Sequence, residues 1–130
     1  FTFSDPAEAV YAGWYTAACG YDGFLRWAYN SWVEEPLTDS RLRTFPAGDT
    51  YIVYHGARSS VRFERLVEGI QDAEKISILK KEFTAAGTPE AASRFGQLEA
   101  LLSGFATVTP EANWQDRLSE AKRKLNELSR

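Results

Sequence analysis

The sequence "VRFERLVEGIQDAEKISILKKEF", residues 61–83, has the clearest structural pattern in the chain. Its apolar residues recur with a period close to 3.6, which is typical of an α-helix with one buried face. The charged residues among them are spaced three or four apart, as in ion pairs on a solvated helix surface. Ser59 or Ser60 is a suitable N-cap, because a serine hydroxyl accepts a hydrogen bond from the first helical turn. The sequence therefore predicts a long amphipathic helix with the apolar stripe Phe63, Leu66, Val67, Ile70, Ala73, Ile76, Leu79 and Phe83.

A second helix is indicated near the start of the chain. Asp5 is a suitable N-cap and Pro6 suits the first helical position, because proline has no N–H to leave unbonded there. Gly20 provides the left-handed residue that commonly ends a helix. We therefore expect a helix over about residues 6–19.

Two more helices are indicated after residue 87. The sequences "TPEAASRFGQLEALLSG" and "TPEANWQDRLSEAKRKLNELSR" each open with Thr-Pro, the N-cap and first-position pair of a helix. The second also carries an apolar stripe from Trp114 to Leu128. Helices are therefore expected after Thr88 and after Thr109.

Two segments have the composition of β-strands. The sequence "GFLRWAYN", residues 23–30, is apolar on both faces, as in a strand buried on both sides of an α/β sheet. The sequence "TYIVY", residues 50–54, combines β-branched and aromatic residues. Residues 31–50 between them carry loop signals. Two strands cannot form a sheet that is covered on both faces, so we expect an incomplete α/β fold whose other strands lie outside this chain.

The composition fits one globular domain and limits its partners. The chain has 130 residues, a net charge of -3 and a pI near 5.2, which give no electrostatic reason to expect nucleic acid or an anionic membrane. The single cysteine excludes an internal disulfide. The chain contains no Met and begins at Phe1, so we expect a piece of a longer protein. Exposed strand edges would favour self-association of the isolated piece.

Trp27, Tyr29, Asn30 and Trp32 stand together at the end of the first expected strand. Sugar rings have apolar faces rimmed by hydroxyls, so a carbohydrate site needs aromatic plates and a few amide or carboxylate groups. This segment offers both. The same aromatics also suit a core covered by the following loop, and composition alone leaves both interpretations open.

Other residues with chemical potential have simpler explanations. Asp49 is either a turn-forming residue or a hydroxyl acceptor. Glu34 and Glu35 precede a proline in a loop, where solvated charge explains them better than catalysis. His55 is the only histidine, and without a Cys cluster or a second His we expect no metal site. Cys19 fits a buried structural thiol.

Three stretches together resemble a known family. In their order and separations, "GFLRWAYNSW", "FPAGDTYIVYHG" and "SSVRFERLVEGIQDAEKI" resemble the C-terminal region of the catalytic domain of glycoside hydrolase family 123 and its uncharacterised bacterial relatives. The resemblance covers about residues 4–80. It implies that residues 1–86 are the C-terminal portion of a (β/α)-barrel glycosidase domain, and that residues 87–130 are a C-terminal helical extension.

The resemblance also implies a reaction and a substrate. The family acts on terminal β-linked N-acetylgalactosamine without a cofactor, and the acetamide oxygen of the sugar attacks its own anomeric carbon. An adjacent Asp-Glu pair assists, but no "DE" occurs in this sequence, so the pair is expected upstream of Phe1 and no catalytic residue is assigned here. The family further implies a secreted, periplasmic or cell-surface parent protein.

On this basis the chain contributes part of a sugar-binding wall and is inactive alone. Its partners would be an N-acetylhexosamine-containing glycan and the rest of the parent barrel. The alternative is a non-catalytic module that binds carbohydrate or protein. The expected substrate-binding residues are Trp27, Tyr29, Asn30, Trp32, Asp49 and Tyr54.

Overall fold

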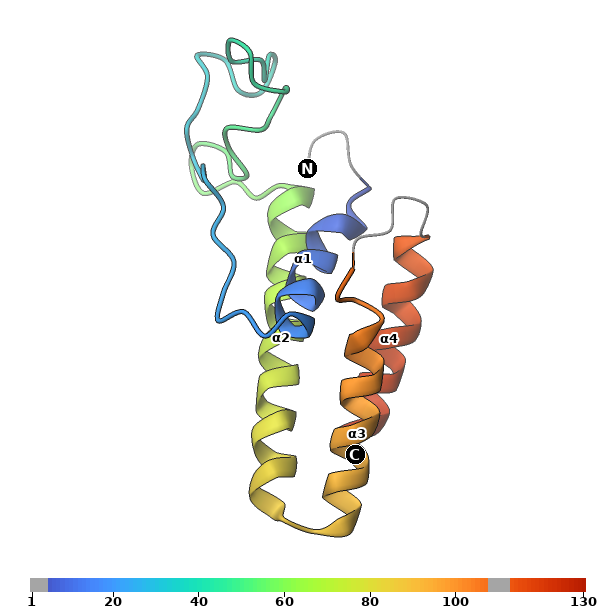
Figure 1. Cartoon of the computed structure of the whole chain (residues 1–130). Coiled ribbons are helices and arrows are strands. Elements are labelled where there is room, and N and C mark those ends of the chain that lie inside the picture. The colour runs from blue at the N-terminus through green and yellow to red at the C-terminus, as the bar shows by residue number, and fades with distance from the viewer. Residues whose placement is uncertain (1–4, 108–112) are drawn as a thin grey trace.

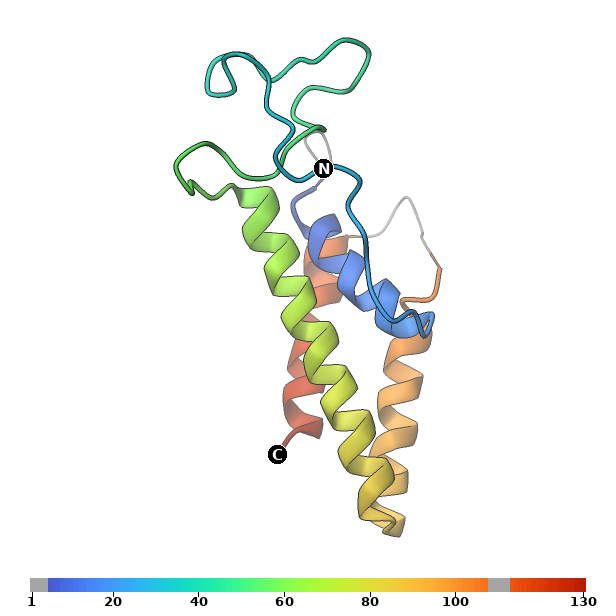
Figure 2. The ribbon, with the colours of Figure 1, turned by 90° about the vertical axis from the view of Figure 1, so that its left-hand side faces the viewer.

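The computed structural model describes residues 5–107 and 113–130, and most of this part of the chain is helical. The helices are α1 (Ala7–Ala18), α2 (Val61–Ala86), α3 (Pro89–Ser103) and α4 (Trp114–Leu128). Figure 1 and Figure 2 show α2, α3 and α4 lying lengthwise beside one another, with the short α1 crossing the N-terminal half of α2. The non-helical residues 19–60 first run from the end of α1 back beside α2, and most of them then extend beyond the N-terminal end of α2 (Figure 1). All six expected substrate-binding residues lie in this segment.

The expected strands at 23–30 and 50–54 do not form, so the α/β part of the fold prediction is wrong for the described residues, whereas its helix-rich part is confirmed by the four helices. The two segments meet at a single antiparallel bridge between Asn30 and Tyr51. Its hydrogen bonds run from Ser31 N to Thr50 O (3.0 Å) and from Ile52 N to Tyr29 O (2.9 Å). A strand needs a neighbour along its length, and only the ends of these segments meet.

Ser60 and Thr88 are N-caps as expected, whereas Pro6 rather than Asp5 occupies the N-cap position of α1. Asp5 Oδ1 accepts a hydrogen bond from Ala7 N (2.8 Å) at the start of α1. Ser60, rather than Ser59, caps α2, and Thr88 caps α3 by accepting from Ala91 N (3.1 Å). These hydroxyl and carboxylate oxygens satisfy N–H groups that have no partner within the helix.

The start of α4 differs from the expected one. Thr109 lies outside the described residues, and α4 begins at Trp114 with Asn113 as its N-cap. Asn113 Oδ1 accepts a hydrogen bond from Asp116 N (3.3 Å). Asparagine is as effective an N-cap as serine or aspartate, so the sequence did contain a suitable N-cap for α4 at Asn113.

Ser60 links α2 to the non-helical segment as well as capping the helix. Its Oγ accepts from Phe63 N (3.1 Å) and donates to the Ile52 carbonyl oxygen. We expect Ser60→Ala to lower the free energy of unfolding by about 1–2 kcal/mol, because both bonds are lost. Urea unfolding followed by circular dichroism would measure this change. The matched variant Ser59→Ala should cost less than about 0.5 kcal/mol, and equal costs would contradict the assignment of the cap.

One hydrophobic core joins all four helices. Residues of α1, α2, α3 and α4 all contribute to it, and Trp14 of α1 is fully buried at its centre beside Phe105 (4.8 Å between ring centroids). The expected boundary between residues 86 and 87 falls in the short turn between α2 and α3. The division of the chain at this point stays a prediction. None of the described helices is long and apolar enough to cross a membrane.

Two glycines allow α1 and α2 to touch through their backbones. A Cβ atom added to Gly13 would lie 2.0 Å from the carbonyl oxygen of Gly69, and one added to Gly69 would lie 2.7 Å from the carbonyl oxygen of Val10. Real Cβ atoms do not approach so closely. Gly13, which weakens an isolated helix, is therefore required by the helix crossing.

A chain of polar contacts then fixes α4 against this crossing. Trp14 Nε1 donates to Asp72 Oδ2 (2.8 Å), and Lys122 Nζ of α4 lies 3.1 Å from the same carboxylate oxygen. Lys122 also pairs with Glu68, which accepts from Arg65 Nη1 (2.5 Å). These contacts are partly shielded from water, so salt screens them less than fully exposed pairs. They connect α1, α2 and α4 into one frame.

Candidate functional site

Four side chains of the non-helical segment meet at the surface, and we call Arg26, Trp27, Phe45 and Asp49 the Trp27 cluster. The Trp27 and Phe45 rings stack with centroids 4.9 Å apart and planes 24° apart. Asp49 accepts hydrogen bonds from Trp27 Nε1 (3.3 Å) and from Arg26 Nη2 (2.6 Å). Trp27 is still 55% exposed. The cluster presents an aromatic surface beside an ion pair.

Two turns place Phe45 and Asp49 beside Trp27. Phe45 N donates to the Leu42 carbonyl oxygen (3.0 Å), closing a turn in which Arg43 has φ 54°. Asp49 N donates to the Pro46 carbonyl oxygen (3.0 Å) in the next turn. The Asp49 carbonyl oxygen also accepts from the Arg26 guanidinium, 23 residues earlier in the chain. Side-chain contacts therefore hold together two distant parts of the segment.

Tyr29 and Asn30 follow Trp27 along the chain and are exposed at the surface. The Tyr29 ring is 50% exposed and meets Phe63 of α2 edge-on, with centroids 6.0 Å apart. Asn30 forms the single bridge with Tyr51. Tyr29 therefore connects the surface that carries Trp27 to the first turn of α2, and Asn30 connects it to Tyr51.

Trp32 and Tyr54 are half-buried and contact other residues than those of the Trp27 cluster. The Trp32 ring packs on His55 with centroids 3.8 Å apart, and its Nε1 donates to the Val53 carbonyl oxygen (2.7 Å). The Tyr54 ring meets Tyr51 edge-on at 5.3 Å. The structure therefore brings Trp27 and Asp49 together and places Trp32 and Tyr54 in contacts that brace the segment.

Tyr51 anchors the non-helical segment from inside. Its side chain is fully buried, and its hydroxyl donates to the Pro36 carbonyl oxygen (2.9 Å). Burial raises the pKa of Tyr51 and the neighbouring Tyr54 raises it further, whereas Arg62 above the ring acts in the opposite direction. The hydroxyl therefore keeps its proton at neutral pH and remains a hydrogen-bond donor.

Arg26 and Phe45 are the members of the Trp27 cluster that sequence reasoning missed. Arg26 directly precedes Trp27, and Phe45 opens the "FPAGD" turn that ends in Asp49. Phe45 is an aromatic residue in a loop and so belongs to no buried face of a helix or strand. This isolated position could have indicated that Phe45 packs against another aromatic residue of the loop. Among the described residues, no three His, Cys, Asp or Glu side chains gather in a group that could hold a metal ion.

The Trp27 cluster can bind a polar molecule that has an apolar face. Phe45 backs the indole of Trp27, so the exposed ring surface is held in place for stacking. A carboxylate has about four lone-pair sites, so Asp49 retains acceptor capacity beyond its bonds to Arg26 and Trp27. This combination of a fixed aromatic plate and a charged rim suits a sugar ring, whose apolar face would stack on the indole while its hydroxyls meet the carboxylate.

Comparisons with known proteins give the family. Residues 1–79 match the family described as glycoside hydrolase 123, catalytic domain. The structure is similar to that of a family 123 glycoside hydrolase from Clostridium perfringens, solved to explain glycolipid glycan hydrolysis, with 27% sequence identity and a TM-score of 0.73. The likeness covers 99% of this chain and 24% of that enzyme's chain. No curated protein sequence matched. The chain belongs to glycoside hydrolase family 123, as part of a larger catalytic domain.

Proposed function

We propose that this chain forms part of the substrate-binding wall of a glycosidase acting on β-linked N-acetylhexosamine glycans, with N-acetylgalactosamine as the terminal sugar. The observation that carries the proposal is the exposed Trp27 ring, stacked on Phe45 and hydrogen-bonded to Asp49. Membership of family 123 supports a glycan as the substrate. Cleavage would use the sugar's acetamide oxygen and an Asp-Glu pair outside these residues.

The expected site residues take different parts in this proposal. Trp27 stacks on the sugar face, while Asp49 and the exposed Asn30 and Tyr29 accept or donate hydrogen bonds to its hydroxyls. A sugar contact by Trp32 or Tyr54 stays a prediction. Both rings pack against other residues of the non-helical segment, Trp32 on His55 and Tyr54 on Tyr51.

The proposal also places the parent protein outside the cytoplasm. It further includes self-association of the isolated chain, for the following reason. Phe24, Leu25 and Trp27 make no backbone hydrogen bond with another described residue, and all three side chains are exposed. Such unpaired backbone recruits a partner strand. Light scattering of the 130-residue chain should therefore give a mass above the 14.6 kDa of a monomer.

Trp27→Ala tests the sugar wall. In the complete catalytic domain we expect kcat/KM for a chromogenic N-acetyl-β-galactosaminide to fall roughly 10- to 100-fold, because burying a large apolar side chain contributes about 1.5–3 kcal/mol. The midpoint of thermal unfolding should hardly change, since Trp27 is an exposed residue. Leu37→Ala, at a 65% exposed residue of the same segment, is the matched control and should keep full activity.

Two outcomes would contradict the proposal in different ways. Unchanged kcat/KM in Trp27→Ala would remove the Trp27 cluster from the substrate wall. A complete domain that cleaves none of the common β-hexosaminides, yet binds the free sugar through Trp27, would favour the alternative of a non-catalytic carbohydrate-binding module.

A further inference from the structure

Two ion pairs of the non-helical segment have the same residue types but different surroundings. Arg26 Nη2 lies 2.6 Å from Asp49 Oδ1, and Arg41 Nη2 lies 2.6 Å from Asp39 Oδ2. The side chains of Arg26 and Asp49 are 14% and 24% exposed, whereas those of the other pair are 79% and 46% exposed. Exposed pairs usually contribute little, since water and salt screen them. The pair between Arg26 and Asp49 is therefore the one that can hold a side chain in a fixed orientation.

The guanidinium of Arg26 holds Asp49 at its main chain as well as at its carboxylate. Arg26 Nη2 donates to the Asp49 carbonyl oxygen and to Oδ1 of the same residue. The last side-chain torsion of an aspartate is broad, so its carboxylate has no fixed orientation by itself. Contact with both oxygens ties the carboxylate to its own main chain. Oδ1 is thereby directed to Arg26, and Oδ2 is the oxygen that accepts from Trp27 Nε1.

The hydrogen bond from Trp27 to Asp49 is the weaker of the two contacts of this carboxylate. Its 3.3 Å length exceeds the value of about 2.9–3.0 Å that is commonest for N–H···O bonds, and it lies at an exposed part of the surface. In the contact with Arg26 both partners are charged and the distance is only 2.6 Å. The same guanidinium lies 5.8 Å from the centroid of the Trp27 ring, within cation–π distance. Arg26 therefore determines where the carboxylate lies relative to the indole.

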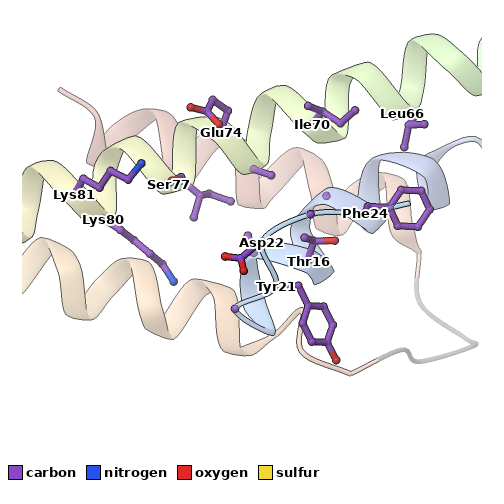
Figure 3. A pocket seen from close by; sticks show the side chains of 16 residues that line it. Thr16, Tyr21, Asp22, Phe24, Leu66, Ile70, Glu74, Ser77, Lys80 and Lys81 are labelled. Carbon is purple, nitrogen blue, oxygen red and sulfur yellow. The ribbon is translucent and has the colours of Figure 1, made fainter. Parts of the chain in front are cut away.

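The chain around Arg26 is attached to α2 on both sides. Two residues before it, Phe24 lies near Leu66 of α2, and both line the groove between α1 and α2 (Figure 3). Three residues after it, the Tyr29 ring meets Phe63 of α2, with centroids 6.0 Å apart. Arg26 thus links the helical frame to a carboxylate that lies 23 residues later in the chain.

We propose that Arg26 is a positioning residue of the substrate wall, which acts through Asp49 without touching the sugar. Arg26 holds Oδ1, so that Oδ2 lies at the edge of the Trp27 indole. There Oδ2 accepts a hydrogen bond from a hydroxyl of a sugar stacked on that ring. Side chains locked by such supporting contacts bind a ligand without first having to be ordered. This role rests on the proposed function, because it requires that Asp49 meet a sugar.

Arg26→Met in the complete catalytic domain tests this role. Methionine keeps much of the apolar side chain but cannot hold the carboxylate. We expect KM for a chromogenic N-acetyl-β-galactosaminide to rise roughly 5- to 20-fold while kcat changes by less than about two-fold, because Asp49 binds the sugar without taking part in bond cleavage. Arg41→Met, which removes the exposed pair with Asp39, is the matched control and should leave both constants unchanged.

A double-mutant cycle shows whether Arg26 acts through Asp49. Asp49→Ala should raise KM at least as much as Arg26→Met does, and adding Arg26→Met to it should raise KM by less than about two-fold more. Additive increases would overturn the proposal, since Arg26 would then act on the sugar directly. An unchanged KM in Arg26→Met, beside a loss of activity in Trp27→Ala, would overturn this role and leave the substrate wall standing. Unchanged activity in both variants would remove the substrate wall as well.

The indole N–H signals in the NMR spectrum of the 130-residue chain test the contact without a substrate. Trp27→Phe identifies the Trp27 signal among those of the four Trp residues. Arg26→Met should shift that signal upfield, because the hydrogen bond to Asp49 is weakened, while the Trp32 signal stays in place. An unchanged Trp27 signal would overturn the proposal even if KM rose. So would a shift of both signals, which would show that Arg26 only stabilises the segment as a whole.

Discussion

Replacing Gly13 by alanine is expected to lower the free energy of unfolding by roughly 3 kcal/mol. The new Cβ atom would lie 2.0 Å from the carbonyl oxygen of Gly69, so α1 and α2 would have to separate where they cross. Forcing extra volume into a packed contact commonly costs about 1–3 kcal/mol, and here the neighbour is backbone, which cannot rotate away. Urea unfolding followed by circular dichroism would measure the loss.

Gly96→Ala is the matched control for this prediction. Gly96 lies inside α3, and a Cβ atom there meets nothing within 4 Å. Alanine should therefore stabilise α3 by about 0.5–1 kcal/mol through its higher helix propensity. If both variants were stabilising, the close crossing of α1 and α2 would be wrong, since only helix propensity would then distinguish glycine from alanine at residue 13.

The second large effect is expected for Trp14→Ala, which should cost about 3–5 kcal/mol. Trp14 is fully buried, packs against Phe105 and donates to Asp72 Oδ2 (2.8 Å). Its removal would leave a cavity between α1, α2 and α3 and would take one donor from the Asp72 carboxylate. Chemical unfolding followed by far-ultraviolet circular dichroism is the suitable measurement, because tryptophan fluorescence would itself change.

Trp14→Phe separates the two contributions. Phenylalanine keeps most of the aromatic packing but cannot donate to Asp72, so we expect a smaller loss of about 1–2 kcal/mol. Lys122→Met, which removes the other partner of Asp72, should add little to the loss from Trp14→Ala if the two contacts act together. A cost below about 1 kcal/mol for Trp14→Ala would contradict its place at the centre of the core.

The helices could be predicted from the sequence because their determinants are local. Asp5, Ser60 and Thr88 mark three starts, and each oxygen accepts the expected hydrogen bond from its own first turn. The prediction of two strands was wrong because strands are not determined locally. A strand depends on a neighbour that the local sequence does not contain, and residues 23–30 find one only at Asn30.

Of the Trp27 cluster, Trp27 and Asp49 were predicted from the sequence, but Phe45, Arg26 and the grouping of the four residues were not. Trp27 and Asp49 were singled out by residue type, and the structure brings them into contact across 22 positions. Phe45 and Arg26 were missed because their roles depend on how the turns at 42–45 and 46–49 fold back. Contacts that cross a long irregular segment leave no periodic signal, whereas the face of a helix does.

Because Gly13 and Gly69 bring the backbones of α1 and α2 into direct contact, the loop between these two helices can vary in length. Residues 19–60 form a loop whose two ends are held together by the packing of α1 on α2. This packing offsets most of the entropic cost of closing the loop. Doubling a flexible loop costs only about 0.6 kcal/mol in closure entropy. Under the proposed function, insertions near the exposed turn at 42–45, which positions Phe45 beside Trp27, would alter the sugar preference with little effect on the helical frame.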